Sequence, residues 1–165
     1  MSEMVEKARK YEIEESIKIA QDNRPVYHFS NPVGWMNDPN GFSDYKGEHH
    51  LFFQYYPYAT HWDSMHWGHA KSTDFIKWEY LPVALAPDQD YDKLGVFSGS
   101  AIEDGDKQIL IYTGVEEKVV ENGEKCICQN QCIAIGNGVD YNKIVNNPVV
   151  TANMLPKGSS LEDFR

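Results

Sequence analysis

The chain has 165 residues and carries 25 acidic against 15 basic side chains, a formal net charge of −10. Polyanions are bound by clustered Lys and Arg, so this balance argues against nucleic acid or an anionic membrane as a partner. An apolar content of 41% is that of a globular chain long enough for one ordinary domain. The sequence contains no apolar run long enough to span a bilayer.

The first twenty residues carry charges throughout. A secretory signal needs a basic start followed by an unbroken apolar stretch, so this segment is not predicted to be one. Three cysteines are an odd number and give no self-contained disulfide framework. We therefore expect a cytoplasmic protein.

Residues 1–23 are predicted to form a leader helix. Ile13 and Ile17 are four residues apart and Ala20 continues their face, while Glu and Lys at i,i+4 spacing occupy the other sides. Pro25 closes the segment. Two interpretations stay open: a helix packed on the main body, residues 24–165, or a solvated helix with no further role.

From Tyr27 onward short apolar runs alternate with Gly, Pro, Asn and Asp, which is typical of strands and turns. No intervening segment is long enough for a crossover helix, so the sheets should be antiparallel. The predicted strands are 41–45, 48–55, 65–71, 76–85, 97–103, 108–112, 127–135 and 141–145.

A faint repeat relates residues 69–82 to residues 133–148. Ala70 and Ala134 hold matching places in it, and so do Pro82 and Pro148. A recurring four-stranded unit is typical of a β-propeller blade, although two similar hairpins in a sandwich would give the same pattern. A propeller needs several blades, so two alone would leave open edges through which the chain could self-associate.

Residues 34–41, Gly-Trp-Met-Asn-Asp-Pro-Asn-Gly, are the most distinctive segment. Pro39 keeps Asp38 out of the helical region, and Asn40-Gly41 is expected to form a tight turn after it. One interpretation is an ordinary turn. The other is a carboxylate fixed at the rim of a sheet, with an amide and an aromatic ring beside it.

Four further segments follow in a characteristic order: residues 52–57, 62–70, 97–101 and 162–165. Together with residues 34–41 they resemble glycoside hydrolase family 32, the invertases, sucrose-6-phosphate hydrolases and fructanases. The resemblance implies an all-β fold, the first two blades and the start of the third of a five-bladed β-propeller with antiparallel four-stranded blades. Residues 24–165 would then be a partial catalytic domain without the family's C-terminal β-sandwich, preceded by the leader helix.

The resemblance also implies roles for individual residues. Asp38 matches the catalytic nucleophile. Trp35 either shapes the pocket or packs in the core, and Val96 departs from the Cys of many sucrose-6-phosphate hydrolases with little expected effect. The positions matched to contacts with the fructosyl unit are Asn37, Gln54, Trp62, Phe97, Ser98 and Arg165.

The reaction implied is retaining hydrolysis of terminal β-D-fructofuranosides, sucrose or sucrose 6-phosphate, which needs two carboxyl groups. We expect this chain to supply only the nucleophile half of the site and to be inactive alone, because the family's acid/base Glu and stabilising Asp match no residue in it. Alternatives are a non-catalytic fructoside-binding or regulatory module and a non-functional fragment. The remaining candidates, expected to be solvated loop or turn carboxylates, are Glu103, Glu116, Glu117, Glu121, Glu124 and Glu162.

No cofactor and no metal are expected. His66 and His69 are three apart on a predicted strand and point to opposite faces, which favours structural roles over a shared ion. Cys126, Cys128 and Cys132 share one parity along a strand but lack a second pair at zinc spacing. They are predicted to be buried free thiols.

Overall fold

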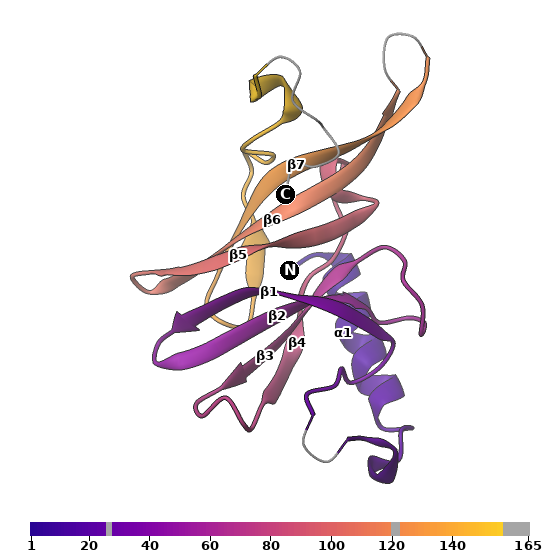
Figure 1. The fold of residues 1–165 in the computed structure, drawn as a ribbon, viewed down its shortest axis with the longest axis vertical. Helices are drawn as coiled ribbons and strands as arrows, with labels where there is room; N and C mark the ends of the chain where they lie inside the picture. The colour runs from indigo at the N-terminus through magenta and orange to yellow at the C-terminus, as the bar shows by residue number, and fades with distance from the viewer. Residues whose placement is uncertain (26–27, 120–122, 157–165) are drawn as a thin grey trace.

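The computed structural model describes residues 1–25, 28–119 and 123–156. In this part of the chain a single α-helix precedes two four-stranded antiparallel sheets, in the orders β1-β2-β3-β4 and β5-β6-β7-β8 (Figure 1). The antiparallel prediction and all eight predicted strands are confirmed. The elements are α1 (Glu3–Ser16), β1 (Trp35–Tyr45), β2 (Glu48–Tyr56), β3 (His66–Ser72), β4 (Glu79–Leu85), β5 (Gly95–Asp104), β6 (Lys107–Val119), β7 (Lys125–Gly136) and β8 (Tyr141–Lys143), with 3-10 turns at Gln21–Asn23, Asp90–Asp92 and Ala152–Met154.

The repeat has a structural counterpart in the two sheets. Ala70 lies in β3 and Ala134 in β7, each the third strand of its sheet, and both side chains are fully buried. Lys46 and Gly47 join β1 to β2 with φ of 51° and 80°, the positive values that a two-residue hairpin turn requires. Each sheet is therefore a meander of consecutive strands.

The main core lies between the two sheets. Phe52 and Trp67 come from the first sheet, and Leu110, Tyr112 and Ala134 come from the second. A further apolar layer covers the other face of the first sheet, where Phe53, Tyr55 and Val83 pack against Ala8 of α1. The first sheet is thus buried on both faces.

Helix α1 packs through a different face from the predicted one. Ile13 and Ile17 are 67% and 80% exposed, whereas Val5, Ala8 and Glu12 are buried. The prediction that Ile13, Ile17 and Ala20 form the apolar face is wrong, because the buried face follows Val5 and Ala8 and includes a charged residue. The helix also ends at Ser16, before the predicted boundary. The division into a leader and a domain from residue 24 stays a prediction.

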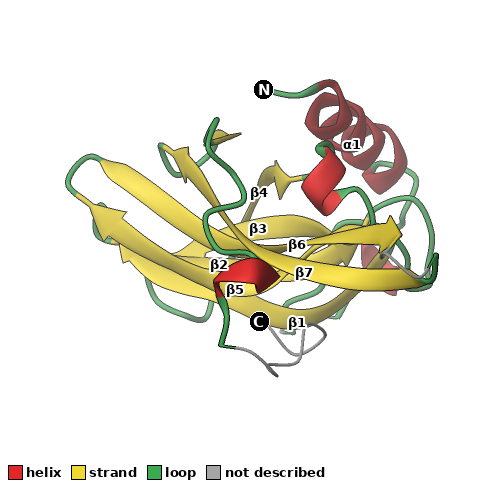
Figure 2. Ribbon diagram, turned by 90° about the horizontal axis from the view of Figure 1, so that it is seen from above, coloured by secondary structure: helices red, strands yellow, loops and turns green. Residues whose placement is uncertain are grey.

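The contact between α1 and β4 involves polar side chains as well as apolar ones. Arg9 Nε donates to the Val83 carbonyl (2.9 Å), and Glu12 Oε2 accepts from the Val83 amide (3.2 Å). Arg9 also pairs with Asp140 (2.6 Å), in the turn before β8. Figure 2 shows α1 on the β4 side of the first sheet, with β1 on the far side. The helix therefore covers the outer edge of β4 and connects it to the second sheet.

Strand boundaries differ from the predictions where charged or turn-forming residues continue a strand. β1 begins at Trp35 rather than residue 41, so the Asn40-Gly41 turn is wrong: Gly41, with φ of 55°, lies at an irregularity inside β1. β6 continues to Val119 rather than residue 112, paired along its whole length with β7. No helix among the described residues is long and apolar enough to cross a membrane.

Candidate active site

Asp38 lies at a β-bulge in edge strand β1. Met36 pairs with Tyr55 and Pro39 with Phe53, so Asn37 and Asp38 together stand opposite the single residue Gln54. Pro39 lacks an N–H group and is tolerated because β1 is an edge strand. Bulges bend a strand and re-aim its side chains, which is why they recur beside active sites. The Asp38 side chain is exposed here.

Asn37 is oriented by its neighbour Trp35. The indole Nε1 of Trp35 donates to Asn37 Oδ1 at 2.9 Å, which leaves the Asn37 amide N–H groups available to another acceptor. Trp35 is itself 36% exposed. The core interpretation of Trp35 is therefore wrong, and its position at the surface beside Asn37 and Asp38 fits a pocket wall.

Gln54 joins the first sheet to the second. Its side chain is only 3% exposed, and its Nε2 donates to the Val96 carbonyl at 3.0 Å. Trp67 Nε1 donates to the next carbonyl, that of Phe97, at 3.1 Å. Two side chains of the first sheet thus fix the backbone that leads into Phe97 and Ser98. β1 and β5 are in contact, although they belong to different sheets (Figure 1).

A second bulge lies at Ser98. Phe97 pairs with Thr113 and Gly99 with Tyr112, so Ser98 has no partner residue in β6. Thr113 Oγ1 donates to the Ser98 carbonyl (3.1 Å) and itself accepts from Gln131 Nε2 (3.0 Å). At Gly99 a Cβ atom would lie 1.9 Å from the Ile111 carbonyl oxygen, so only glycine allows this close approach.

Trp62 reaches the second sheet from the loop between β2 and β3. Its ring contacts that of Phe97 edge-on, with centroids 6.0 Å apart and planes at 74°. Trp62 is 54% exposed, so much of its indole faces solvent. An exposed aromatic face suits the C–H surface of a sugar.

The predicted residues thus lie in two groups, and the hydrogen bond from Gln54 to the Val96 carbonyl connects them. Asn37 and Asp38 of the β1 bulge stand opposite Gln54 of β2. Phe97 and Ser98 lie at the start of β5, where the ring of Trp62 contacts that of Phe97. Arg165 lies outside the described residues. Sequence reasoning missed the connecting roles of Trp67, Thr113 and Gln131; Trp67 lies within a recognised motif, whereas nothing in the pattern marked Thr113 or Gln131.

The glutamates that match no catalytic motif were expected to be solvated loop or turn carboxylates, and this does not hold for all of them. Glu116 lies in β6, is 8% exposed, and bonds Asn130 Nδ2 and Lys118 Nζ at 2.7 Å each, so that expectation is wrong for Glu116. Glu103 and Glu117 are exposed as expected but belong to β5 and β6 rather than to loops. Glu121 and Glu162 lie outside the described residues.

The buried histidines have hydrogen-bonding roles. His66 Nδ1 lies 2.8 Å from the Ser64 carbonyl oxygen, and His69 Nε2 lies 2.8 Å from His50 Nδ1. Burial lowers the pKa of His66 to about 4 and that of His69 well below its usual value. Among the described residues no group of three or more His, Cys, Asp or Glu side chains could hold a metal ion.

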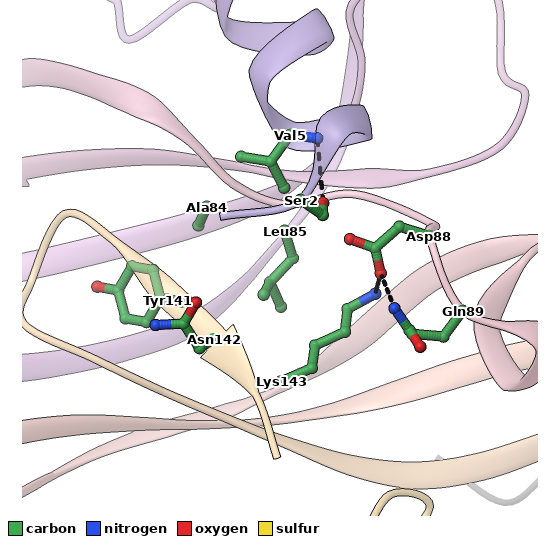
Figure 3. A pocket seen from close by; sticks show the side chains of 9 residues that line it. All are labelled: Ser2, Val5, Ala84, Leu85, Asp88, Gln89, Tyr141, Asn142 and Lys143. Carbon is green, nitrogen blue, oxygen red and sulfur yellow. Dashed lines mark hydrogen bonds and ion pairs between the residues drawn. The ribbon is translucent and has the colours of Figure 1, made fainter. Parts of the chain in front are cut away.

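A separate polar cavity of about 140 Å³ lies between the start of α1, the end of β4 and β8 (Figure 3). Lys143 fills one side of it and pairs with Asp88 (2.6 Å) and with the fully buried Asp92 (2.5 Å). Lys143 Nζ also donates to the Ala86 carbonyl at 2.7 Å. Its donors are therefore all engaged, and this cluster joins the sheets rather than offering a free cation.

Comparison with known proteins assigns the class to which this fold and site belong. A sequence model described as the glycosyl hydrolases family 32 N-terminal domain matches residues 28–165. The chain therefore belongs to glycoside hydrolase family 32, and the resemblance seen in the sequence is confirmed.

Individual relatives sharpen that assignment. The chain is 49% identical over 121 residues to a sucrose-6-phosphate hydrolase of Zymomonas mobilis, covering 72% of this chain and 23% of the relative. It is 46% identical over 134 residues to a levanase of Bacillus subtilis, covering 79% of this chain and 19% of the levanase. A Bombyx mori family 32 β-fructofuranosidase superposes with a TM-score of 0.81 at 42% identity, over 93% of this chain and 32% of that enzyme. The chain thus spans about a quarter of the length of these curated relatives.

Proposed function

We propose that this chain supplies the nucleophile half of a retaining β-fructofuranosidase site. The observation that carries the proposal is the bulge that places Asn37 and Asp38 opposite Gln54, whose amide is fixed to the backbone before Phe97. An exposed carboxylate on a rigid strand can attack an anomeric carbon, while neighbouring amides and hydroxyls hold the sugar. Asp38 is the nucleophile in this proposal.

The other predicted site residues are proposed to bind the fructosyl unit through different kinds of contact. Asn37 offers its amide to fructose hydroxyls, and Gln54 offers the amide atoms that its bond to the Val96 carbonyl leaves over. Trp62 and Phe97 offer aromatic surface, and Ser98 offers a hydroxyl. Arg165 is proposed to contribute a guanidinium to the same fructosyl unit. In this arrangement the two sheets are the first two blades of a five-bladed propeller.

In this proposal the chain is inactive alone, because a retaining mechanism needs a second carboxyl group about 5–5.5 Å from the first. The substrate proposed is sucrose or sucrose 6-phosphate. It is supported by the relatives named sucrose-6-phosphate hydrolase and by the Bombyx mori enzyme, a variant of which is known in complex with sucrose. A cytoplasmic location is part of the proposal, supported by the three free thiols.

The test is a chimera in which residues 28–165 replace the matching segment of the Zymomonas mobilis relative. Release of reducing sugar from sucrose and from sucrose 6-phosphate is measured for the chimera, its Asp38→Asn variant and the 165-residue chain alone. We expect an active chimera, a loss of at least about a thousandfold in Asp38→Asn, and no activity from the chain alone.

Asp44→Asn is the matched control, because Asp44 is an exposed aspartate of the same strand, paired with His49. It should leave the rate within about twofold. Equal losses in both variants would contradict the role of Asp38. An active 165-residue chain would contradict the half-site.

The alternative, a non-catalytic fructoside-binding module, is favoured by one observation: the Trp62 ring is 54% exposed beside Phe97, and a sugar could stack on it without any chemistry. Titration calorimetry of the 165-residue chain with fructose and sucrose separates the two proposals. Binding by the chain, together with a chimera that is inactive although folded, would favour the module. No binding by the chain and an active chimera would favour the half-site.

A further inference from the structure

Two thiols of β7 lie side by side near the end of the β6–β7 hairpin. Cys126 and Cys128 are two residues apart, so their side chains project from the same face of the strand. Their sulfur atoms are 3.4 Å apart and both thiols are free. Cys132 shares their parity but lies in the core between the sheets, with its Sγ 3.7 Å from the Asn130 carbonyl oxygen.

The two thiols differ in access. Cys126 is partly exposed, whereas Cys128 is only 6% exposed. Burial raises the pKa of Cys128 to about 11 and that of Cys132 to about 12. A reagent in solution therefore meets Cys126 first, and the thiols of Cys128 and Cys132 stay protonated and slow to react.

The opposite strand presents charge to this pair. Lys118 lies across from Cys126 and Glu116 across from Cys128. The Lys118 ammonium attracts negative charge on both sulfurs, while its own partner is Glu116 at 2.7 Å. An ion pair thus lies on the strand opposite the two thiols.

The backbone around the pair is held on one side only. Within the part of the chain that the structure describes, β8 pairs with β7 only at residues 134–136, so residues 125–128 pair with β6 alone. Figure 1 shows this hairpin reaching beyond the neighbouring strands of the second sheet. A disulfide needs the sulfurs to approach to about 2.0 Å, and a projecting hairpin can bend to allow it at smaller cost than a central strand.

We propose that Cys126 and Cys128 form a redox-active dithiol that exchanges with small-molecule disulfides. The Cys126 thiolate attacks one sulfur of the reagent, forming a mixed disulfide and expelling one thiolate. Cys128 gives its proton to the expelled thiolate, attacks the Cys126 sulfur and expels the second thiolate. This second thiolate takes up a proton from water, which balances the proton that Cys126 released to water at the start. The two cysteines are oxidised to one disulfide, and the reagent is reduced to two thiols.

The experiment treats the 165-residue chain with oxidised glutathione in the presence of a metal chelator. Remaining thiols are then alkylated, and the tryptic peptide 126–143, which contains all three cysteines, is fragmented in a mass spectrometer. We expect a peptide lighter by two hydrogen atoms, with the bond between Cys126 and Cys128 and the alkyl group on Cys132. Thiol consumption at Cys126 should be at least about tenfold faster than at Cys132.

Two substitutions separate the steps. Cys128→Ser should trap glutathione on Cys126, because no second thiol is left to displace it, whereas Cys132→Ser, the matched control, should form the disulfide as the unaltered chain does. The unaltered chain unfolded in urea should lose the selectivity for the 126–128 pair. A bond from Cys132 to either neighbour, or stable glutathione adducts on all three cysteines in the native chain, would overturn the proposal, and neither result depends on a variant that folds.

Discussion

The two sheets have the same four-stranded plan but different surroundings. The first is buried on both faces, by the second sheet on one side and by α1 with its adjoining loop on the other. Among the described residues, the second is covered on one face only: Ile102, Ile111 and Ile127 are 58%, 39% and 41% exposed on the other. Register places these side chains on the face opposite Leu110 and Tyr112. We therefore expect buried side chains of the first sheet to contribute more to stability than those on the outer face of the second.

The strongest test of this comparison truncates one apolar side chain in each sheet. Phe53 is 1% exposed and lies against Gly68, Phe29 and Tyr55, so Phe53→Ala should lower the free energy of unfolding by about 3–5 kcal/mol. Ile111→Ala should lower it by under about 1 kcal/mol, because the side chain is partly in water already. Urea unfolding followed by circular dichroism measures both. Equal losses would mean that the second sheet is as well packed as the first.

Because the outer face of the second sheet exposes apolar side chains, we also propose that the isolated chain self-associates. Ile111→Lys places a charge in the middle of this face and should shift the chain towards monomer. Sedimentation velocity over a range of protein concentrations measures the shift. Phe42→Lys, an exposed aromatic of the first sheet (55% exposed), is the control and should leave the association unchanged. A chain that is monomeric without substitution would contradict the prediction.

The link between the sheets is tested by Gln54→Leu. The substitution leaves the buried Val96 carbonyl without its donor, and such a group costs about 1–3 kcal/mol. We expect that loss in urea unfolding, and a fall in the rate of the chimera beyond what lower stability explains, because Phe97 and Ser98 lose their support. Unchanged activity in a folded variant would show that Gln54 contributes to packing alone.

Acid stability is balanced between opposing groups of the first sheet and its helix. Burial raises the pKa of Glu12 from 4.5 to about 7, so Glu12 adds stability at low pH that is lost as pH rises from 4.5 to 7. His66, with its pKa lowered to about 4, does the opposite and removes stability as pH falls from 6.5 to 4. His69 and His50, whose pKa values are also lowered by burial, act in the same direction as His66.

Glu12→Gln should therefore expose the full acid sensitivity of the histidines. Between pH 6.5 and 4.5 the slope of unfolding free energy against pH should steepen by about 1.4 kcal/mol per pH unit. Urea midpoints measured across this range give the slope. Glu14→Gln, which changes an exposed glutamate of the same helix, should leave it unaltered. An unchanged slope in Glu12→Gln would mean that Glu12 is ionised in the folded chain.

The smallest effect is expected for Val96→Cys. Val96 is fully buried, but it meets Gln54 through its backbone carbonyl, which the substitution keeps. We expect a change in unfolding free energy of under about 1.5 kcal/mol and a chimera of nearly unaltered rate. A large loss of rate would show that the side chain at position 96 shapes the sugar site directly.

The sequence predicts the sheets better than the details of the site. Short apolar runs between turn residues located every strand of the described residues, because buried strands are apolar and Gly, Pro, Asn and Asp favour the turns between them. The bulges at Asn37-Asp38 and Ser98 were not predictable, since they depend on register between strands that are paired only in the folded chain. The apolar face of α1 was mispredicted because Glu12, which accepts from Val83, occupies a position that hydrophobic periodicity assigns to solvent.

Residue identity in the site came from ordered motifs rather than from physical patterns. Asp38 in isolation is compatible with an ordinary turn, and Trp62 with a surface aromatic. What the motifs did not reveal is the role of backbone groups: the carbonyls of Val96, Phe97 and Ser98 all accept hydrogen bonds from side chains. A backbone acceptor leaves no signature in the sequence.

The contact between α1 and Val83 closes the outer edge of the first sheet. Arg9 and Glu12 occupy both the carbonyl and the amide of this residue on the outer side of β4, as a neighbouring strand would. The helix therefore occupies backbone groups of an edge strand that would otherwise be open to pairing with another chain.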